Sequence, residues 1–402
     1  MFRLTRFLTE LVRPTPVRER RDPPGPVVIW NLIRRCNLLC KHCYSISGDV
    51  DFPGELTTDR VIRVLDDLKA ARVPAIILSG GEPLLRPDIY DIGDRAKALG
   101  FSVSLSSNGA LIDDAHADRI AAAGFDYVGV SLDGIGAVHD RFRGRPGSFE
   151  ASIAGIRRLA TRGLEVGLRF TMTTDNQESF PALLDLMKAE GATKFYLSHL
   201  VYSGRGNKNR TTDAEFAVTR DAMRRLFAVA RADVLAGSER EYVTGNNDAD
   251  GAFLWMWVQE NFPDRAAHMR GKLAEWGGNA SGVNVANIDN LGQVHPDTFW
   301  WDYPLGHVLE RRFGEIWADT SDPLMAGFKA RPRTISGRCG ECSVFDICGG
   351  NTRVRAWRLT GDAFAEDPAC YLTDAEIGLA GDRDRLAVTP FRGLSHEPYR
   401  VA

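Results

Sequence analysis

Short apolar runs alternate with longer amphipathic segments along the first half of the chain. Runs rich in Val, Ile, Leu and Phe, bounded by Gly, Pro, Ser or Asp, are typical of buried strands. They predict strands at residues 27–33, 75–79, 101–106, 127–131, 166–172 and 194–198. Between them, apolar residues at helical spacing predict helices at 58–71, 87–99, 113–123, 148–162 and 180–190.

The expected helix ends carry their own signals. Asp113 and Ser148 stand where an N-cap side chain would accept a free backbone N–H. Glycines suited to end a helix follow four of the segments, at Gly100, Gly124, Gly163 and Gly191. Repeated strand–helix units imply parallel strands with right-handed crossovers. Six units are too few for a closed eightfold barrel. The sequence therefore predicts an α/β fold, a partial (β/α)6 barrel with ligands at the carboxyl ends of its strands.

Composition is that of a soluble globular protein with room for more than one domain. The 402 residues are 44% hydrophobic and 26% charged, with a formal net charge of −3. This balance gives no argument for nucleic acid or an anionic membrane surface as a partner. The chain has no apolar run long enough for a membrane span, and its first residues lack the apolar core of a signal peptide. We therefore expect a cytoplasmic protein.

Three of the seven cysteines follow the first predicted strand. Cys36, Cys40 and Cys43 have the spacing C-x3-C-x2-C, which can hold three irons of a 4Fe–4S cluster. No fourth Cys lies nearby, whereas ferredoxin and zinc motifs use four protein ligands. The fourth iron would be open to a ligand such as the amino and carboxylate groups of S-adenosylmethionine (SAM). Three buried free cysteines are the alternative.

The other four cysteines, Cys339, Cys342, Cys348 and Cys370, form a second set. An odd total in a reducing compartment argues against a disulfide framework. Four thiolates can close a 4Fe–4S cluster or hold one zinc ion tetrahedrally. The presence of the first motif favours a cluster, and zinc or free structural cysteines are the alternatives.

Glycine-rich and polar corners follow the next three predicted strands. The second strand leads into Gly80-Gly81-Glu82-Pro83, where glycines permit close backbone approach and Glu82 offers an acceptor for an ammonium group. Small polar groups suited to a ribose or an amino-acid moiety follow the next two strands, at Ser106, Asn108, Ser131 and Asp133. Arg143 could pair with a carboxylate through its planar guanidinium. Because these corners share one edge of the expected barrel with the cysteines, we expect one cofactor site.

On these motifs, residues 27 to about 200 resemble the core domain of the radical SAM superfamily. The resemblance implies formation of a 5′-deoxyadenosyl radical. It implies that Gly80, Gly81, Glu82 and Pro83 lie near the SAM amino group. It also implies that Ser106, Asn108, Ser131 and Arg143 surround the ribose and carboxylate, with Tyr44 near the adenine.

The C-terminal part resembles the SPASM/Twitch extensions that hold auxiliary Fe–S clusters. It departs from the full SPASM pattern at Asp297, which stands where a Cys is expected, and after Cys348, where residues 349–352 lack a further Cys. One auxiliary cluster rather than two is implied. The expected segments are an N-terminal helix or arm with linker (1–26), the core (27–236), a helical linker (237–280), an auxiliary domain (281–380) and a tail (381–402).

Over its whole length the chain resembles the radical SAM enzymes of heme d1 biosynthesis. Residues 12–21, residues 40–47 and the spacing of the second cysteine set carry this resemblance. It implies an enzyme that removes propionate side chains from didecarboxysiroheme, a tetrapyrrole, with an electron donor such as flavodoxin or ferredoxin. A coproheme decarboxylase of heme biosynthesis, a peptide maturase and a non-enzymatic Fe–S electron carrier are the alternatives.

Candidate catalytic groups lie after the sixth predicted strand. His199 ends that strand, and Arg205 follows in a basic loop with Lys208 and Arg210. Cations there could receive tetrapyrrole carboxylates, and a histidine at the barrel mouth could donate a proton. We therefore name His199 and Arg205 as candidate catalytic residues. A hydrogen-bonded structural histidine and a solvated basic loop are the alternatives.

Overall fold

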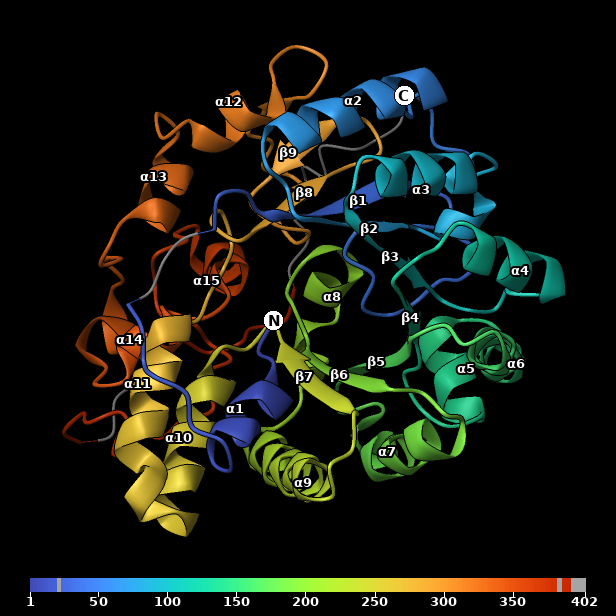
Figure 1. Ribbon diagram of the computed structural model, residues 1–402. Coiled ribbons are helices and arrows are strands. Elements are labelled where there is room, and N and C mark those ends of the chain that lie inside the picture. Colours follow the sequence, from blue (N-terminus) through green and yellow to red (C-terminus); the bar gives the residue numbers. More distant parts are fainter. Residues whose placement is uncertain (20–22, 382–384, 392–402) are drawn as a thin grey trace.

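One curved sheet organises the chain in the computed structural model, which describes residues 1–19, 23–381 and 385–391 (Figure 1). Its strand order is β10-β9-β8-β1-β2-β3-β4-β5-β6-β7. The strands are β1 (Val27–Ile33), β2 (Ala75–Gly80), β3 (Ser102–Ser107), β4 (Tyr127–Ser131), β5 (Val166–Met172), β6 (Lys194–His199), β7 (Glu241–Gly245), β8 (Val285–Ile288), β9 (Gln293–His295) and β10 (Gly306–His307). Strands β1 to β7 pair in parallel in chain order, and β8 pairs in parallel with the other side of β1. Strands β9 and β10 extend the sheet in antiparallel fashion.

The α/β prediction is confirmed. All six expected strands form in the expected order, and β7 and β10 are the two edges of an open sheet. The sequence does not predict β7, which lies in the segment expected to be helical. Only two of its five residues, Tyr242 and Val243, are apolar, so no apolar run marks this strand.

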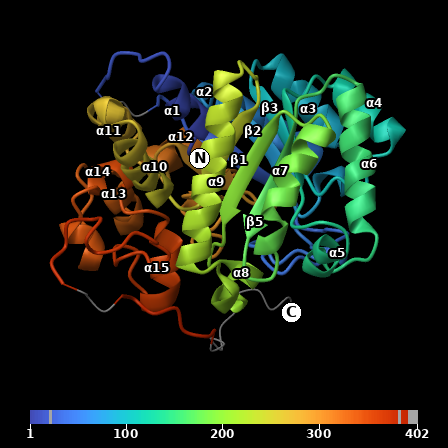
Figure 2. The ribbon, with the colours of Figure 1, turned by 90° about the horizontal axis from the view of Figure 1, so that it is seen from below.

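Helices cover the outer face of the parallel strands (Figures 1 and 2). In this layer are α2 (Thr58–Ala70), α3 (Ile89–Ala98), α4 (Asp114–Ala122), α6 (Ser148–Thr161), α7 (Phe180–Ala189) and α9 (Phe216–Leu235). Helix α5 (Ala137–Arg143) lies instead against the loop after β1, since Leu39 and Lys41 donate to its Arg143 and Phe142 carbonyls. The remaining helices are α1 (Leu4–Glu10), α8 (Gly204–Lys208), α10 (Ala249–Asn261), α11 (Ala266–Trp276), α12 (Phe313–Ala318), α13 (Pro323–Lys329), α14 (Phe345–Cys348) and α15 (Arg353–Thr360). Short 3-10 turns occur at η1 (Pro83–Leu85), η2 (Gln177–Ser179), η3 (Arg210–Thr212), η4 (Pro263–Arg265) and η5 (Gly337–Glu341).

Most of the expected helix-end signals are confirmed, and one is wrong. The four terminal glycines have φ between +67° and +80°. Asp113 caps α4 by accepting the His116 N–H. Ser148, however, is the first residue of α6, and Gly147 holds the N-cap position with φ +77°. The carboxylate of Asp140 in α5 accepts the N–H groups of Gly147 and Phe149 at 2.7 and 2.8 Å, so a neighbouring helix supplies the cap.

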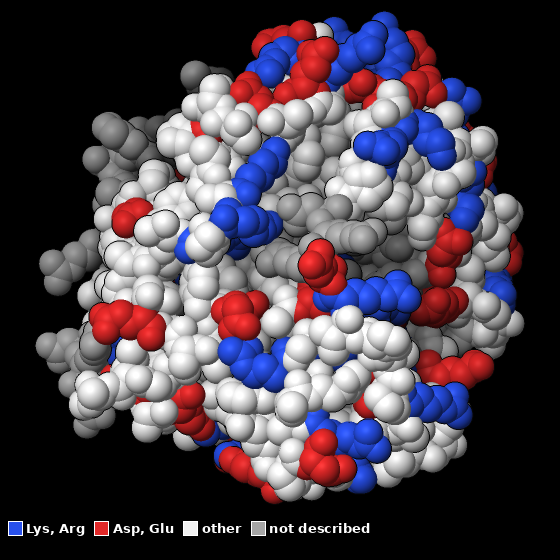
Figure 3. Space-filling model, turned by 60° about the vertical axis from the view of Figure 1, so that its left-hand side comes forward, with Lys and Arg blue, Asp and Glu red and all other residues white. Residues whose placement is uncertain are grey.

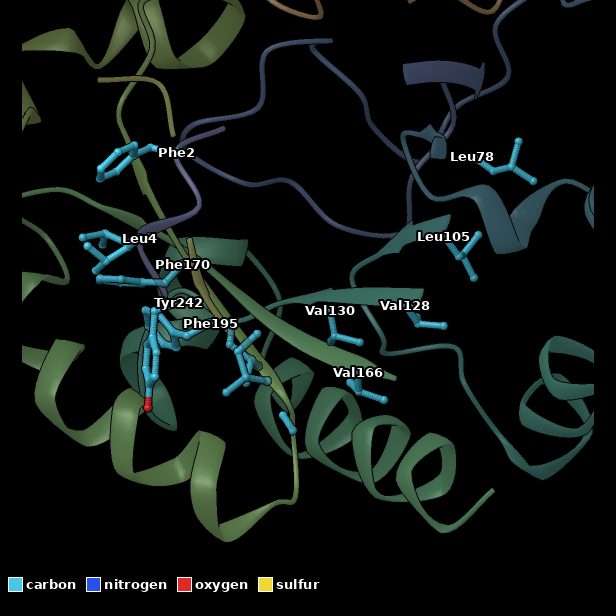
Figure 4. Close-up of a cluster of buried hydrophobic side chains, with 14 of the residues drawn as sticks. Phe2, Leu4, Leu78, Leu105, Val128, Val130, Val166, Phe170, Phe195 and Tyr242 are labelled. Carbon is cyan, nitrogen blue, oxygen red and sulfur yellow. The ribbon is translucent and has the colours of Figure 1, made fainter. Parts of the chain in front are cut away.

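Side-chain alternation along the strands separates an apolar outer face from a more polar inner face. In β5, Leu168 and Phe170 are buried in the core, whereas Arg169 between them is half-buried. Figure 4 shows this core, with Leu4 close to Phe170 and Tyr242. Complete burial of an apolar side chain of this size stabilises the fold by about 1.5–3 kcal/mol.

The N-terminal segment is docked onto the rest of the fold. Phe2 and Thr244 exchange backbone hydrogen bonds of 2.7 and 2.8 Å, and α1 contacts β7, α9 and α11. Residues 20–22 of the expected linker lie outside the described residues, as do 382–384 and 392–402 of the expected tail. The division of the chain into domains stays a prediction. The segment expected to form the auxiliary domain also contributes β8, β9 and β10 to the main sheet.

The distribution of charged side chains on the surface is consistent with the small net charge of the chain. Lys and Arg side chains are interspersed with Asp and Glu side chains over the face shown in Figure 3. Across the described residues, no helix combines the length and apolar character needed to cross a bilayer.

Candidate functional site

The loop after β1 gathers the first three thiols. Cys36, Cys40 and Cys43 pack together with Leu38, and the first two are buried. The N–H groups of Leu38 and Ser47 each point at a sulfur, of Cys36 and Cys43 respectively, at 3.4 Å. Backbone donors aimed at sulfur stabilise the thiolate form that binds metal. The structure thus brings the expected triad together at the carboxyl end of the sheet.

Two glycines let β2 lie directly against this loop. A Cβ atom on Gly81 would lie 2.2 Å from the Arg35 carbonyl oxygen, and one on Gly80 would lie 2.3 Å from that of Ile33. The close approach permits hydrogen bonds from the Gly81 N–H to Ile33 at 2.6 Å and from the Glu82 N–H to Arg35 at 2.9 Å. The backbone of this motif therefore fixes the cysteine loop to the sheet.

The Glu82 side chain joins the ends of β2 and β3. It is fully buried, and its carboxylate accepts the Ser107 hydroxyl at 2.9 Å and the Asn108 and Leu84 N–H groups at 2.8 and 3.2 Å. Burial raises the pKa of Glu82 to about 7. Pro83, which begins η1, is buried beside it. The carboxylate expected to receive an ammonium group thus already has three donors within the chain.

The corners after β3 and β4 adjoin the cysteine loop. The Asn108 side-chain amide donates to the Asn37 side chain at 2.8 Å. The Ser106 hydroxyl accepts a hydrogen bond from Arg169, and Ser131 pairs with Arg169 in the sheet register. The sequence reasoning did not single out Arg169. The sequence feature that could have identified it is a single cation within the mainly apolar run of β5, between Leu168 and Phe170.

A buried ion pair lies beside the thiols. Arg143 Nη2 is 2.5 Å from Asp133 Oδ2, and its Nη1 donates to the Cys40 sulfur at 3.4 Å. Asp133 Oδ1 accepts the Thr171 N–H at 2.8 Å, and Oδ2, the oxygen paired with Arg143, also lies 3.7 Å from His42 Nε2. Desolvation lowers the pKa of His42 to about 4, so the imidazole is neutral at physiological pH. Arg143 therefore supplies the positive charge next to Cys40.

Arg205 holds the cysteine loop from α8. Its Nε donates to the Cys40 carbonyl at 2.7 Å, its Nη1 to the Ser47 carbonyl at 2.8 Å, and its backbone N–H to the Cys43 carbonyl at 2.8 Å. Burial acts to raise the pKa of Cys43, but the charge of Arg205 and hydrogen bonds within the loop outweigh it and lower that pKa. Through these contacts Arg205 positions the backbone of the cysteine loop. Arg210, from the same expected basic loop, donates to the carbonyls of Thr389 and Pro390 instead.

Aromatic side chains from the C-terminal third flank the loop at Tyr44. Its hydroxyl accepts the Asn31 amide at 2.8 Å, and its ring centroid lies 5.5 Å from that of Phe299 and 6.2 Å from that of Trp301. Aromatic residues far apart in sequence therefore pack together beside the cysteine loop.

Four buried polar atoms around the loop have no hydrogen-bond partner within the described part of the chain. They are Asn37 Nδ2, His42 Nδ1, Arg143 Nε and Arg205 Nη2. A buried polar group left unpaired costs roughly 1–3 kcal/mol. A polar or anionic group held at this loop would relieve that cost. The three thiols, two arginines and unpaired donors thus fit an iron–sulfur cluster with three thiolate ligands and a polar ligand beside it.

His199 lies on the outer face of β6, with Phe195 and Leu197. Its Nε2 is 3.0 Å from the Asp250 carboxylate, whose other oxygen accepts the Tyr371 hydroxyl at 2.7 Å. Strand alternation therefore directs His199 away from the barrel interior. It contacts the C-terminal segment that carries the second cysteine set, and its catalytic role stays a prediction.

The four thiols of the second set line one cavity. Cys339, Cys342, Cys348 and Cys370 share it with Arg338 and several apolar side chains. Burial raises the pKa of all four thiols, that of Cys370 to about 12, so their thiolate forms need a cation. In the described part of the chain, no three Cys, His, Asp or Glu side chains are close enough to share a single metal ion. A 4Fe–4S cluster takes one thiolate per iron, which spreads its ligands further apart.

Comparisons with known proteins agree with this geometry. Residues 30–187 match the radical SAM superfamily. The chain is 55% identical to the pre-heme d1 synthase of Dinoroseobacter shibae over 99% of both chains. It is 42% identical to the Fe-coproporphyrin III synthase of Methanosarcina barkeri over 88% of this chain and 89% of that one. The crystal structure of Streptococcus suis SuiB bound to S-adenosylmethionine shares the fold, with a TM-score of 0.66 at 16% identity over 87% of this chain and 78% of that chain. With full-length similarity to such relatives and a cysteine loop of this construction, the chain belongs to the radical SAM superfamily.

Proposed function

We propose that this chain is a radical SAM enzyme of heme d1 biosynthesis that removes propionate side chains from didecarboxysiroheme. The observation that carries the proposal is the 55% identity to a pre-heme d1 synthase across 99% of both chains. The architecture of the cysteine loop supports it, because Arg143 contacts the Cys40 sulfur and Arg205 holds the backbone of the loop.

As a radical SAM protein, the chain uses S-adenosylmethionine and a 4Fe–4S cluster. Cys36, Cys40 and Cys43 would hold three of the irons and leave the fourth for SAM. When bound, the cluster and SAM together supply a 5′-deoxyadenosyl radical that abstracts hydrogen from the substrate. The chain's own residues position the cysteine loop and set the charge around it. Arg205 and the backbone of Gly81 hold the loop, and Arg143 offsets negative charge at Cys40.

The SAM contacts expected from the sequence are retained as part of the proposal. They are Tyr44, Gly80, Gly81, Glu82, Pro83, Ser106, Asn108, Ser131, Asp133 and Arg143. Their support is proximity, since contacts from this group reach the cysteine loop from the corners after three successive strands: Glu82 contacts Arg35, Asn108 contacts Asn37 and Arg143 contacts Cys40. Glu82 and Asp133 already have donors within the chain, so we assign them to shaping the site as well as to contacting SAM.

We also propose that the second cysteine set holds one auxiliary 4Fe–4S cluster, with a redox role as our working hypothesis. The shared cavity of Cys339, Cys342, Cys348 and Cys370 supports a common cofactor. Zinc is the alternative, and metal analysis of purified protein distinguishes the two.

The unpaired cysteines and the need of the chemistry for electrons bear on the compartment and the reductant. All seven cysteines are unpaired, which suits a reducing compartment. We propose a cytoplasmic enzyme that receives electrons from a donor such as flavodoxin or ferredoxin.

The decisive experiment uses anaerobically reconstituted protein with SAM, a low-potential reductant and didecarboxysiroheme. We expect loss of propionate mass from the tetrapyrrole and a matching amount of 5′-deoxyadenosine, both followed by mass spectrometry. A Cys40→Ser variant should yield neither product. Formation of Fe-coproporphyrin III would instead favour the activity named for the 42% identical relative. Deoxyadenosine without any change in the tetrapyrrole would contradict the proposed substrate.

A further inference from the structure

Arg169 is a cation on the inner face of the barrel. It stands in β5 between Ser131 of β4 and Tyr196 of β6 in the sheet register. Its neighbours Leu168 and Phe170 are buried on the opposite face, and Phe170 belongs to the hydrophobic cluster in Figure 4. Arg169 is half-buried. Its side chain therefore lies in the barrel interior rather than in the helix layer.

The guanidinium of Arg169 has polar and aromatic neighbours but no acidic partner. It donates to the Ser106 hydroxyl, and its central carbon lies 5.4 Å from the ring centroid of Tyr196. Within the described residues, no Asp or Glu forms an ion pair with it. A charge in a partly dry interior is normally paired, so this arrangement leaves room for an anion.

Lys194, lower on the same inner face, shows the contrasting case. It pairs in register with Gly167, one inner position before Arg169. Its ammonium lies 3.1 Å from Glu165 and 2.8 Å from Glu241. The chain thus neutralises the cation at the amino ends of the strands, and it leaves the cation nearer their carboxyl ends without a carboxylate.

We propose that Arg169 binds a carboxylate of the tetrapyrrole substrate. This inference rests on the proposed function, which places an acidic macrocycle at the carboxyl ends of the strands. The planar fork of an arginine matches a carboxylate with two parallel hydrogen bonds. The Tyr196 ring lies within cation–π range of the guanidinium, and the hydrogen bond to Ser106 restricts its rotation.

SAM also brings a carboxylate into this site. We assign it to Arg143, which lies at the cysteine loop. Arg143 contacts the Cys40 sulfur and, although it pairs with Asp133, keeps a buried Nε without a partner. Arg169 has its contacts on β3 and β6 instead. The test therefore measures the binding of the tetrapyrrole and of SAM separately.

The test is equilibrium binding of didecarboxysiroheme to reconstituted protein, followed through its absorbance bands. Arg169→Met should weaken binding by about 10- to 100-fold, the effect of losing a charged hydrogen-bonded pair. Arg169→Lys, which keeps the charge but loses the fork, should weaken it less. The matched control, Arg63→Met on the exposed face of α2, should bind as tightly as the unsubstituted protein. The fully methyl-esterified tetrapyrrole should bind the unsubstituted protein and Arg169→Met equally well.

Three further readouts decide the interpretation. Iron content, circular dichroism and SAM affinity of Arg169→Met should match those of the unsubstituted protein. Weakened SAM binding with unchanged tetrapyrrole binding would assign Arg169 to the cofactor and overturn the inference. Equal binding of the free acid by both proteins would overturn the inference alone. Failure of the unsubstituted protein to bind the free acid would overturn the proposed function and this inference with it.

Discussion

Single side chains set the protonation states around the first cysteine loop. Burial acts to raise the pKa of Asp133, but the charge of Arg143 outweighs it, so the carboxylate stays ionised. His139 is held neutral, because desolvation lowers its pKa to about 4 while its Nδ1 accepts the Asp133 N–H at 3.1 Å. Protonation of that imidazole would break the hydrogen bond that fixes the strand end carrying Asp133.

His139 should make the protein less stable in acid. In the unfolded chain its pKa is about 6.5, so between pH 6.5 and 4 the unfolded state binds more protons than the folded state. The stability contributed by neutral His139 is therefore complete above pH 6.5 and is lost as the pH falls toward 4. The pKa difference corresponds to roughly 3 kcal/mol at most. In urea unfolding at pH 7 and pH 4.5, His139→Gln should show a smaller pH-dependent loss than the unsubstituted protein. Equal losses would contradict this assignment.

Arg205 should govern retention of the first cluster. Arg205→Met removes two side-chain hydrogen bonds to loop carbonyls and the charge that lowers the pKa of Cys43. We expect iron to leave the protein about 30-fold faster in the presence of a chelator, because two hydrogen bonds of about 1 kcal/mol each are lost. Arg141→Met, on the exposed side of α5, is the matched control and should release iron at the normal rate. Normal retention with abolished tetrapyrrole turnover would instead favour the catalytic role expected from the sequence.

At the scale of elements, strand ends are placed so that short connections meet at one edge of the sheet. The loop after β1 receives backbone contacts from the end of β2, and Glu82 joins that end to β3. Parallel pairing in chain order brings the ends together, because each right-handed crossover returns the chain to the same edge. The precision of the site therefore depends on close backbone approach between neighbouring strand ends.

Gly81→Ala should separate two such ends. The added methyl would lie 2.2 Å from the Arg35 carbonyl oxygen, so the cysteine loop must shift. We expect a loss of about 1–3 kcal/mol in unfolding free energy and loss of the iron bound by the first set. Gly314→Ala in α12 is the control, since its nearest neighbour would be Ala71 Cβ at 3.5 Å. Full iron content in Gly81→Ala would show that the loop tolerates displacement.

At the scale of the whole molecule, the segment from the end of β6 through α8 links the two cysteine sets, directly to the first and through Arg355 and Asp367 to the second. Arg205 holds the first loop, while Leu200 accepts a hydrogen bond from Arg355 at 3.1 Å. Arg355 forms a fully buried bidentate pair with Asp367, whose carbonyl accepts the Cys370 N–H at 3.3 Å. One short segment thus ties the two thiol clusters to a common frame.

Removing one partner of that buried pair should destabilise the fold strongly. Arg355→Met leaves Asp367 charged and unpaired in the interior, at an expected cost of about 3–5 kcal/mol in unfolding free energy. Arg157→Met breaks a bidentate pair with Glu190 in which the arginine is exposed, and it should change stability little. Urea unfolding of the two variants tests the contrast. Similar losses in both would refute the importance of burial here.

Cys348→Ser should separate the two cofactors. Cys348 is the buried member of the second set, and its loss should remove one cluster, which halves the iron content from about eight to about four per chain if both sets hold 4Fe–4S clusters. SAM cleavage should persist, because the first loop is intact. Tetrapyrrole turnover should fall if the auxiliary cluster has a redox role. Full turnover by the folded variant would leave that cluster a structural role only.

Much of the fold and part of the site could be predicted from sequence because their signals are local. Strand and helix periodicity predicted all six strands of the expected barrel, and cysteine spacing predicted a triad that the structure brings together. The prediction of a cap at Ser148 was wrong because the acceptor comes from Asp140 in another helix. The strand β7 was missed because only two of its five residues, Tyr242 and Val243, are apolar, too few to form an apolar run.

The sequence by itself determined the order of the first six strands, the helices between them and the presence of two thiolate sets, since these depend on residues close together in the chain. Only the tertiary structure decided which side chains meet. His199 contacts Asp250, 51 residues away, and Asp250 contacts Tyr371, a further 121 residues along. Arg169 depends likewise on Ser106, 63 residues before it. Such pairings result from strand register and helix packing over the whole sheet, and no local pattern encodes them.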